Sequence, residues 1–240
     1  MRFLTAVVLA LLAGPAAAAT VEEDVTRYIA IFNGEKSLHS QAAESLGWMG
    51  LSDPRLFDIL EKRALEDYQA ASNSHSEKTR VAWYIRALGF SGLTKYEPTL
   101  AVLQKDQIYV QYVRNARTQR PQYQKWNPLI SNRATFDAQY SDDVNRIRNM
   151  LNSDDMQLWK LGAKRVYFAQ HDDVLLDLLA VKIKASYAPQ YGSFEDADAV
   201  DWMIKALGAA RKEKYKPLFR EVAAGAADAR IRGYAERALR

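Results

Sequence analysis

Few of the side chains that commonly carry out chemistry stand at spacings that would support it. Three histidines occur, and only His171 has acids beside it, Asp172 and Asp173. These residue types can bind a transition metal, but a carboxylate just before a helix more commonly caps that helix. Cysteine is absent, which excludes a thiol nucleophile and disulfide bonds. We therefore predict no metal site.

Paired acids elsewhere have the same explanation. The pairs at 142–143, 154–155 and 196/198 each stand at the expected start of a helix, where free amides and the helix dipole favour negative charge. The sequence holds no glycine-rich phosphate loop, no Gly-x-Ser-x-Gly turn and no His-Glu-x-x-His pair. We therefore predict no catalytic residues and no cofactor.

The best candidate for a binding site is basic and aromatic. The segment at about 117–141 contains two prolines and breaks the helical periodicity, which favours an ordered loop or insertion. Basic side chains with accessible aromatic faces could hold an acidic peptide, a glycan or an anionic envelope polymer. We predict that the partner-binding residues are Arg114, Arg117, Arg120, Lys125 and Trp126. The alternative is that Tyr123 and Trp126 pack onto the rest of the fold.

The first residues have the layout of a secretory signal peptide. Arg2 precedes an apolar run, Gly14 and Pro15 interrupt it, and small residues end at Ala19. We predict a signal peptide over residues 1–19, with cleavage after Ala19; an uncleaved membrane anchor is the alternative. No later stretch is apolar enough to span a bilayer. The expected location is therefore periplasmic or secreted, with no membrane span after cleavage.

The overall charge argues against nucleic acid as a partner. Lys and Arg total 33 against 29 acidic residues. Loss of Arg2 with the leader leaves a surplus of only three positive charges. Such a small surplus over the remaining length does not indicate nucleic-acid binding.

Helical periodicity and an internal repeat dominate the rest of the chain. Residues 83–89 (WYIRALG) recur as residues 202–208 (WMIKALG), an offset of 119. The same offset relates three further identical pairs, which are Tyr96 and Tyr215, Pro98 and Pro217, and Ala116 and Ala235. We interpret these matches as two copies of one helix-turn-helix unit and its successor.

The last unit has an acid, an aliphatic-arginine pair, and small and aliphatic residues at fixed offsets: Asp228, Ile231, Arg232, Ala235, Ala238 and Leu239. Units with the same spacing begin near 35, 155 and 196, but they lack the arginine. Weaker units begin near 77 and 110, and the one near 110 has the pair Val113 and Arg114. In this pattern the sequence resembles the HEAT-repeat family. The resemblance implies an all-α fold, an α-solenoid of antiparallel helix pairs in a HEAT-like superhelix, with residues 20–240 as a single domain. Tetratricopeptide-like arrays and irregular helical bundles are the alternatives.

The resemblance also implies a function. HEAT-like arrays present extended concave surfaces that suit proteins or peptides. We expect an exported, non-enzymatic binding or scaffold module of the cell envelope, whose partner is an envelope protein or peptide, acidic ones included. One alternative is a HEAT-like enzyme or enzyme subunit, because some proteins that this chain resembles are lyases. Another is a structural element that stacks end to end with itself.

Overall fold

The chain is helical throughout the part that the computed structural model describes, which covers residues 20–70, 74–169 and 171–240. No strand occurs in these ranges, which confirms the all-α prediction. The expected leader, residues 1–19, lies outside the described residues. The α-helices of the described ranges are α1 (Val21–Asn33), α2 (His39–Ser45), α3 (Pro54–Ala70), α4 (His75–Phe90), α5 (Glu97–Leu103), α6 (Val110–Ile130), α7 (Asp142–Asn152), α8 (Met156–Phe168), α9 (Asp173–Ser186), α10 (Phe194–Ala209), α11 (Lys216–Gly225) and α12 (Ala229–Ala238).

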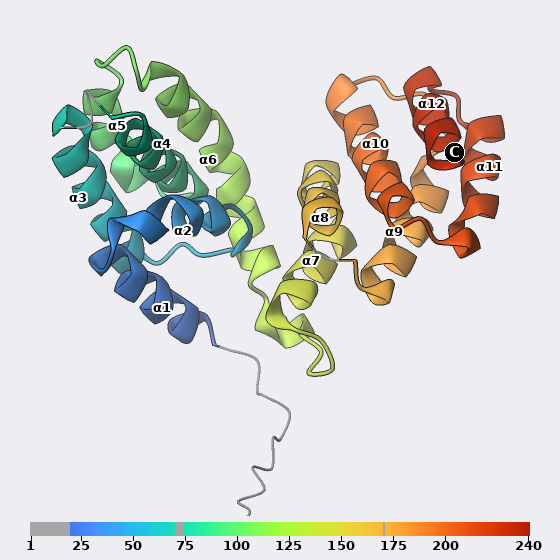
Figure 1. The fold of residues 1–240 in the computed structure, drawn as a ribbon, viewed down its shortest axis with the longest axis horizontal. Helices are drawn as coiled ribbons and strands as arrows, with labels where there is room; N and C mark the ends of the chain where they lie inside the picture. The colour runs from blue at the N-terminus through green and yellow to red at the C-terminus, as the bar shows by residue number, and fades with distance from the viewer. Residues whose placement is uncertain (1–19, 71–73, 170) are drawn as a thin grey trace, which may run out of the picture.

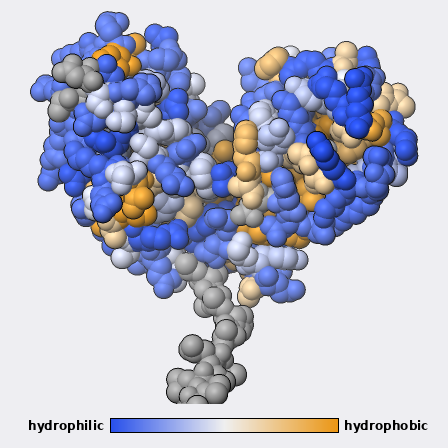
Figure 2. Space-filling model, viewed as in Figure 1, coloured by the Kyte–Doolittle hydropathy of each residue, from blue (hydrophilic) through white to orange (hydrophobic). Residues whose placement is uncertain are grey.

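Short 3-10 helices connect several of these elements. They are η1 (Lys36–Leu38), η2 (Leu46–Trp48), η4 (Thr94–Tyr96), η5 (Arg133–Thr135) and η6 (Glu213–Tyr215). Among the described helices, none has both the length and the apolar composition that a bilayer crossing requires. Figure 2 shows a mostly hydrophilic surface with apolar residues exposed in patches.

The helices form two groups that lie side by side (Figure 1). The first group, α1 to α6, encloses a hydrophobic core that includes Phe32 and Tyr84. The second group, α7 to α12, encloses a core that includes Met203. Met150 of α7 and Leu158 of α8 belong to the first core, so the beginning of the second group packs against the first.

The two groups are copies of one arrangement. Each of α3, α4, α5 and α6 begins 119 residues before its counterpart α9, α10, α11 or α12, and α1 ends 119 residues before α7 ends. The contacts repeat as well, because α4 contacts α2, α3 and α6, whereas α10 contacts α8, α9 and α12. This offset is the one found in the sequence. It relates two groups of six helices, whereas the sequence predicted only one helix-turn-helix unit and its successor in each copy. We call α1–α6 the first copy and α7–α12 the second copy.

Side-chain contacts repeat with the same offset. The hydroxyl of Tyr96 donates to Asp58 Oδ1 at 2.8 Å, and the hydroxyl of Tyr215 donates to Asp177 Oδ1 at 2.7 Å. In each copy the lysine before the tyrosine also pairs with that aspartate, at 2.7 and 2.8 Å. The repeat therefore preserves how consecutive helices are joined, and not only their spacing in the sequence.

Small residues allow the helices to approach closely, as the sequence indicates. A Cβ atom added to Gly89 of α4 would lie 2.7 Å from the Cα atom of Ala116 in α6. A Cβ atom added to Gly208 of α10 would lie 2.9 Å from the Cβ atom of Ala238 in α12. Real Cβ atoms do not approach so closely, so glycine is required for this packing.

The prediction of a loop or insertion at about 117–141 is wrong for its first half. Residues 117–130 belong to α6, which continues through Pro121 and Pro128. Both prolines are exposed and lie two helical turns apart on one face. The carbonyl groups that lose an amide partner can therefore bind water, and the helix is not interrupted.

Candidate functional site

The basic residues selected from the sequence lie on α6 but have different surroundings. Arg114 and Lys125 are exposed. Arg117 and Arg120 pair with Glu97 of α5, with nitrogen–oxygen distances of 2.5 and 2.7 Å. Two of the four cations therefore have a partner within the chain, and their binding to an external partner stays a prediction.

Trp126 does not offer an aromatic face to a partner, which corrects its selection as a binding residue. Its side chain is only 6% exposed, its indole Nε1 donates to Asp155 Oδ2 at 2.7 Å, and its ring lies edge-on to that of Tyr123. Asp155 also accepts from the amides of Gln157 and Leu158, so it caps α8 as the sequence indicates. The tryptophan therefore joins α6 to the beginning of the second copy.

A different basic and aromatic surface lies on the second copy. A hollow of about 790 Å³ is lined by α8, α10, α12, the turn after α10 and the first residue of α11 (Lys216–Gly225). We call it the basic groove, and its charged and aromatic members include Trp202, Lys205, Arg211, Tyr234, Arg237 and Arg240. Pockets of this size hold small ligands or short peptide segments.

Cations lie over the aromatic rings of the basic groove. Lys205 Nζ is 4.4 Å from the ring centre of Trp202 and 4.7 Å from that of Tyr234. Arg237 lies over Tyr234 at 4.1 Å, and Lys164 of α8 lies over Trp202 at 4.8 Å. Each contact falls within the range of a cation–π interaction. The rings therefore hold the positive groups in place along three helices.

The positive charge of the basic groove is not neutralised. Its carboxylate, Glu213, pairs with Lys216 at 2.8 Å. In the described part of the chain, no carboxylate lies within 4 Å of the charged nitrogens of Lys205, Arg211 or Arg237. Burial, followed by repulsion from Lys160 and Lys205, lowers the pKa of Lys164 below its ordinary value. The groove is therefore suited to a negatively charged ligand.

Apolar side chains are exposed beside these cations. Phe168, at the end of α8, is 69% exposed, and its neighbour Tyr167 is also exposed and lies edge-on to it. A large exposed phenylalanine beside an uncompensated positive surface is typical of a contact with another molecule.

No family model, curated protein or solved structure matches the chain. The chemistry of its own surfaces is therefore the basis for assigning a function.

The basic groove was not predicted from the sequence, although the repeat contains a signal for it. Trp83 and Arg86 of α4 recur as Trp202 and Lys205 of α10, and Arg86 lies 4.6 Å from the ring centre of Trp83. A tryptophan with a cation one helical turn later is thus common to both copies. The basic residues that make the second copy different lie at positions where the first copy has none.

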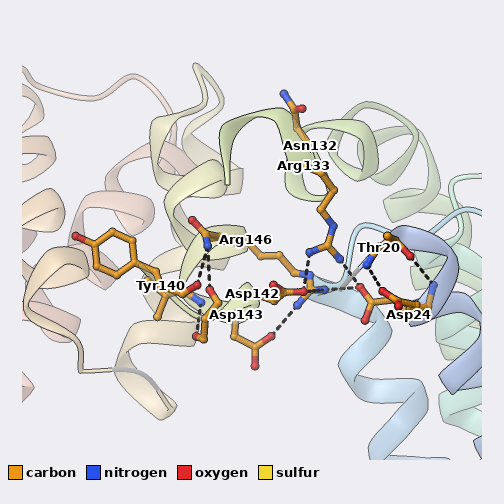
Figure 3. Close-up of polar contacts among 12 residues, drawn as sticks. Thr20, Asp24, Asn132, Arg133, Tyr140, Asp142, Asp143 and Arg146 are labelled. Atoms are coloured by element: carbon orange, nitrogen blue, oxygen red, sulfur yellow. Dashed lines mark hydrogen bonds and ion pairs between the residues drawn. The ribbon is translucent and has the colours of Figure 1, made fainter. Parts of the chain in front are cut away.

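A second hollow, of about 740 Å³, lies where the two copies meet, and an ion-pair network crosses it. Figure 3 shows Arg133 and Arg146 directed toward Asp24 of α1. Both arginines donate to Asp24 Oδ2 at 2.5 Å, although they lie 109 and 122 residues away in sequence. Arg27 donates to Asp24 Oδ1 at 2.7 Å. Asp24 and Arg146 are buried, so both charges depend on this network for compensation.

Aspartates of α7 complete this network. Asp142 accepts from Arg133 at 2.6 Å, and Asp143 accepts from Arg146 at 3.0 Å. The opposite charges are matched, so the network joins α1 to α7 rather than presenting a reactive group. In the same hollow, Arg165 of α8 lies 3.7 Å from the ring centre of Trp48, which adds a further contact between the copies.

The histidine and aspartate trio is dispersed. His171 Nε2 lies 3.4 Å from the carbonyl oxygen of Tyr167, and Asp173 pairs with Lys212 at 2.5 Å. Asp172 is the N-cap residue of α9, but its side chain makes no capping hydrogen bond. In the described ranges, no three His, Cys, Asp or Glu side chains are grouped as metal ligands would be.

Proposed function

We propose that the chain is an exported helical-repeat protein that binds a protein or peptide of the cell envelope through its basic groove. In this proposal the helices stack as an α-solenoid of antiparallel pairs, as in the HEAT-repeat proteins that the sequence resembles. The observation that carries the binding function is the uncompensated positive charge of the basic groove beside exposed apolar side chains.

The contacts between helices support stepwise stacking. Within each copy the even-numbered helices contact in order, α2 with α4 and α4 with α6, then α8 with α10 and α10 with α12. An array in which each unit buries its apolar face against the next one has this pattern.

The start of α1 supports cleavage after Ala19. Thr20 is the N-cap of α1, and its side chain accepts from the amide of Glu23 at 3.1 Å. The nitrogen of Thr20 donates to the Glu23 carboxylate at 2.6 Å. Cleavage would turn this nitrogen into an ammonium group, and the same carboxylate would compensate its charge.

The arrangement of the rings favours a protein partner over nucleic acid. Proteins that bind single strands stack bases on free aromatic faces. Here Lys164 and Lys205 lie over Trp202, and Lys205 and Arg237 lie over Tyr234. Both of these rings are thus occupied by cations, which suits acidic side chains, and Phe168 beside them offers an apolar contact.

Selection from a library of short random peptides tests this function. We expect the full chain to enrich acidic peptides, and the double variant Lys205→Glu, Arg237→Glu to lose them. Arg86→Glu is the matched control, because it alters the equivalent cation in the first copy. Arg114→Glu with Lys125→Glu tests the residues of α6 chosen from the sequence. A selection that enriches no peptide contradicts the proposed function.

A further inference from the structure

The end of α6 covers one side of the first copy. The ring of Tyr123 lies 4.8 Å from that of Phe90, centre to centre, and its hydroxyl donates to the carbonyl of Gly47 at 3.0 Å. The buried amide of Asn127 donates to the carbonyls of Leu51, Phe90 and Ser91, at 3.1, 2.9 and 3.2 Å. Residues 120–130 thus satisfy the backbone at the end of α4 and cover its apolar side chains.

No described segment covers the second copy in this way. α12 is described to Ala238, which is equivalent to residue 119 of α6, and Leu239 and Arg240 are equivalent to residues 120 and 121. Met49 of the first copy is 3% exposed, whereas Phe168, at the equivalent position, is 69% exposed. Ala209, the equivalent of the buried Phe90, is exposed as well. The uncovered surface is the side of the basic groove formed by the ends of α8 and α10.

The second copy is more basic than the first at the equivalent surface. In the first copy, Glu97 pairs with Arg117 and Arg120 of α6. The residue equivalent to Glu97 is Lys216, which lines the basic groove. Further cations of the groove replace uncharged residues, because Gly92, Thr118 and Pro121 of the first copy correspond to Arg211, Arg237 and Arg240. The covering segment of the first copy meets an acid, whereas a segment that covers the second copy meets cations.

We propose that the basic groove binds an acidic helical segment of a partner protein, in the place that residues 120–130 occupy in the first copy. This inference rests on the proposed function, and it specifies the conformation and charge of the ligand. The first copy shows that the architecture accepts a helix there, and the uncompensated charges of Arg211 and Arg237 favour an acidic one.

Arg211 modifies how closely the partner helix approaches. A Cβ atom at Gly92 would lie 2.7 Å from the backbone nitrogen of Gln124, so α6 packs directly on this glycine. Arg211 at the equivalent position keeps a partner helix farther from α10. Its guanidinium group can then pair with a carboxylate of that helix.

A pair of matched peptides tests the inference. The control peptide has the sequence of residues 117–130, and the probe carries R117E, R120E and K125E in the same sequence. Peptides of this length are largely unfolded when free. We expect the probe to bind the full chain at least about tenfold more tightly than the control peptide, because its charge is complementary to the groove. NMR carbon shifts of the isotope-labelled probe should become helical on binding.

Charge-reversal variants locate the site. Lys205→Glu and Arg237→Glu should each weaken probe binding by about tenfold, and Arg86→Glu should change it by less than about twofold. Thermal unfolding of each variant establishes that it is folded. Arg211→Gly provides a second check, because it should weaken binding without loss of stability.

Four results would overturn the inference. The first two are equal affinity of the chain for both peptides, and carbon shifts of the bound probe that show no helix. The third is an affinity for the probe that the groove variants do not change. The fourth is displacement of the probe by an equal concentration of single-stranded DNA or phosphatidylglycerol vesicles. If the random library yields groove-dependent peptides while the acidic probe does not bind, the inference fails and the proposed function stands. If the library yields none, the proposed function itself fails.

Discussion

Gly92 and Arg211 occupy the same position in the two copies, and both have a left-handed backbone, with φ of 73° and 49°. Each follows the end of an equivalent helix, α4 or α10. Glycine adopts this conformation without strain, whereas a residue with a Cβ atom pays about 1–2 kcal/mol. The arginine therefore costs stability at a position where its side chain lines the basic groove.

Replacement of Arg211 by glycine should therefore stabilise the chain by about 1 kcal/mol, since it removes the strain at a positive φ. Urea denaturation measures the change. Arg220→Gly is the control, because Arg220 is exposed inside α11 and glycine there should destabilise by about 1 kcal/mol. A less stable Arg211→Gly variant would show that the arginine side chain has a structural role.

The converse change in the first copy should have the opposite sign. Gly92→Ala introduces a Cβ atom 2.7 Å from the backbone nitrogen of Gln124 and also places a side chain at a positive φ. We expect a loss of about 2–4 kcal/mol in the free energy of unfolding. Gly192→Ala, where an added Cβ atom meets nothing within 4 Å, is the control. Equal effects at the two glycines would contradict the packing of α6 on Gly92.

Asp24→Asn should strongly destabilise the chain. It removes the negative charge that compensates Arg146 in a buried site, and Arg133 loses the same partner. A cost of about 3–5 kcal/mol in unfolding free energy is typical of a broken buried pair. Asp143→Asn is the control, since that side chain is 47% exposed and its loss should cost less than about 1 kcal/mol. Chemical denaturation of both variants decides whether the network is structural.

Asp201 should make stability depend on pH. Burial raises the pKa of its carboxyl group to about 6, against the effect of Arg230, which donates to it at 2.7 Å. The folded chain therefore retains a proton that the unfolded chain releases near pH 4. The stability contributed by this group falls as the pH rises from about 4 to about 6, and the loss is complete above that range.

The comparison with Asp201→Asn isolates this effect. The wild-type chain should lose about 2–3 kcal/mol relative to the variant between pH 4 and pH 7. Urea denaturation of both proteins gives the difference in unfolding free energy between wild type and variant at each pH. A relative gain for the wild type with rising pH would mean that the carboxyl group is ionised in the folded chain near pH 4.

The exported chain should begin at Thr20. Intact-mass measurement of the protein recovered from the periplasm or medium should give the mass of residues 20–240, because cleavage is expected after Ala19. Ala19→Arg should block this processing, since a large charged residue replaces the small one at the cleavage site. Recovery of the unprocessed wild-type chain outside the cytoplasm would exclude the predicted cleavage.

The sequence was sufficient to predict the helical class and the offset of the internal repeat. Apolar residues at helical spacing, such as Val21, Val25, Tyr28 and Phe32, predict one buried face of a helix. The last three are buried, whereas Val21, the first residue of α1, is exposed. The match of residues 83–89 with 202–208 depends only on residue identity, so it needs no knowledge of contacts. Both signals are local, which is why they could be read from one sequence.

The site could not be predicted in the same way, because it depends on contacts between distant residues. Pro121 and Pro128 suggest a break in α6, but their exposed positions let the helix continue. From its sequence neighbours, Trp126 is expected to have an accessible ring. In the structure its indole donates to Asp155, 29 residues later, and the ring is buried. The basic groove combines residues of four helices, and no short stretch of sequence contains its charge.

The ion pairs of Asp24 also constrain the order in which the chain can mature. A chain that emerges N-terminus first presents α1 long before Arg133 and Arg146 are synthesised, since these residues follow Asp24 by 109 and 122 positions. Until α7 has emerged, the carboxylate has only the exposed Arg27 of its own helix and water as partners, and α1 cannot complete its docking. Division of the gene between the copies would therefore leave the first half with an acid whose buried counter-charge lies on the other fragment.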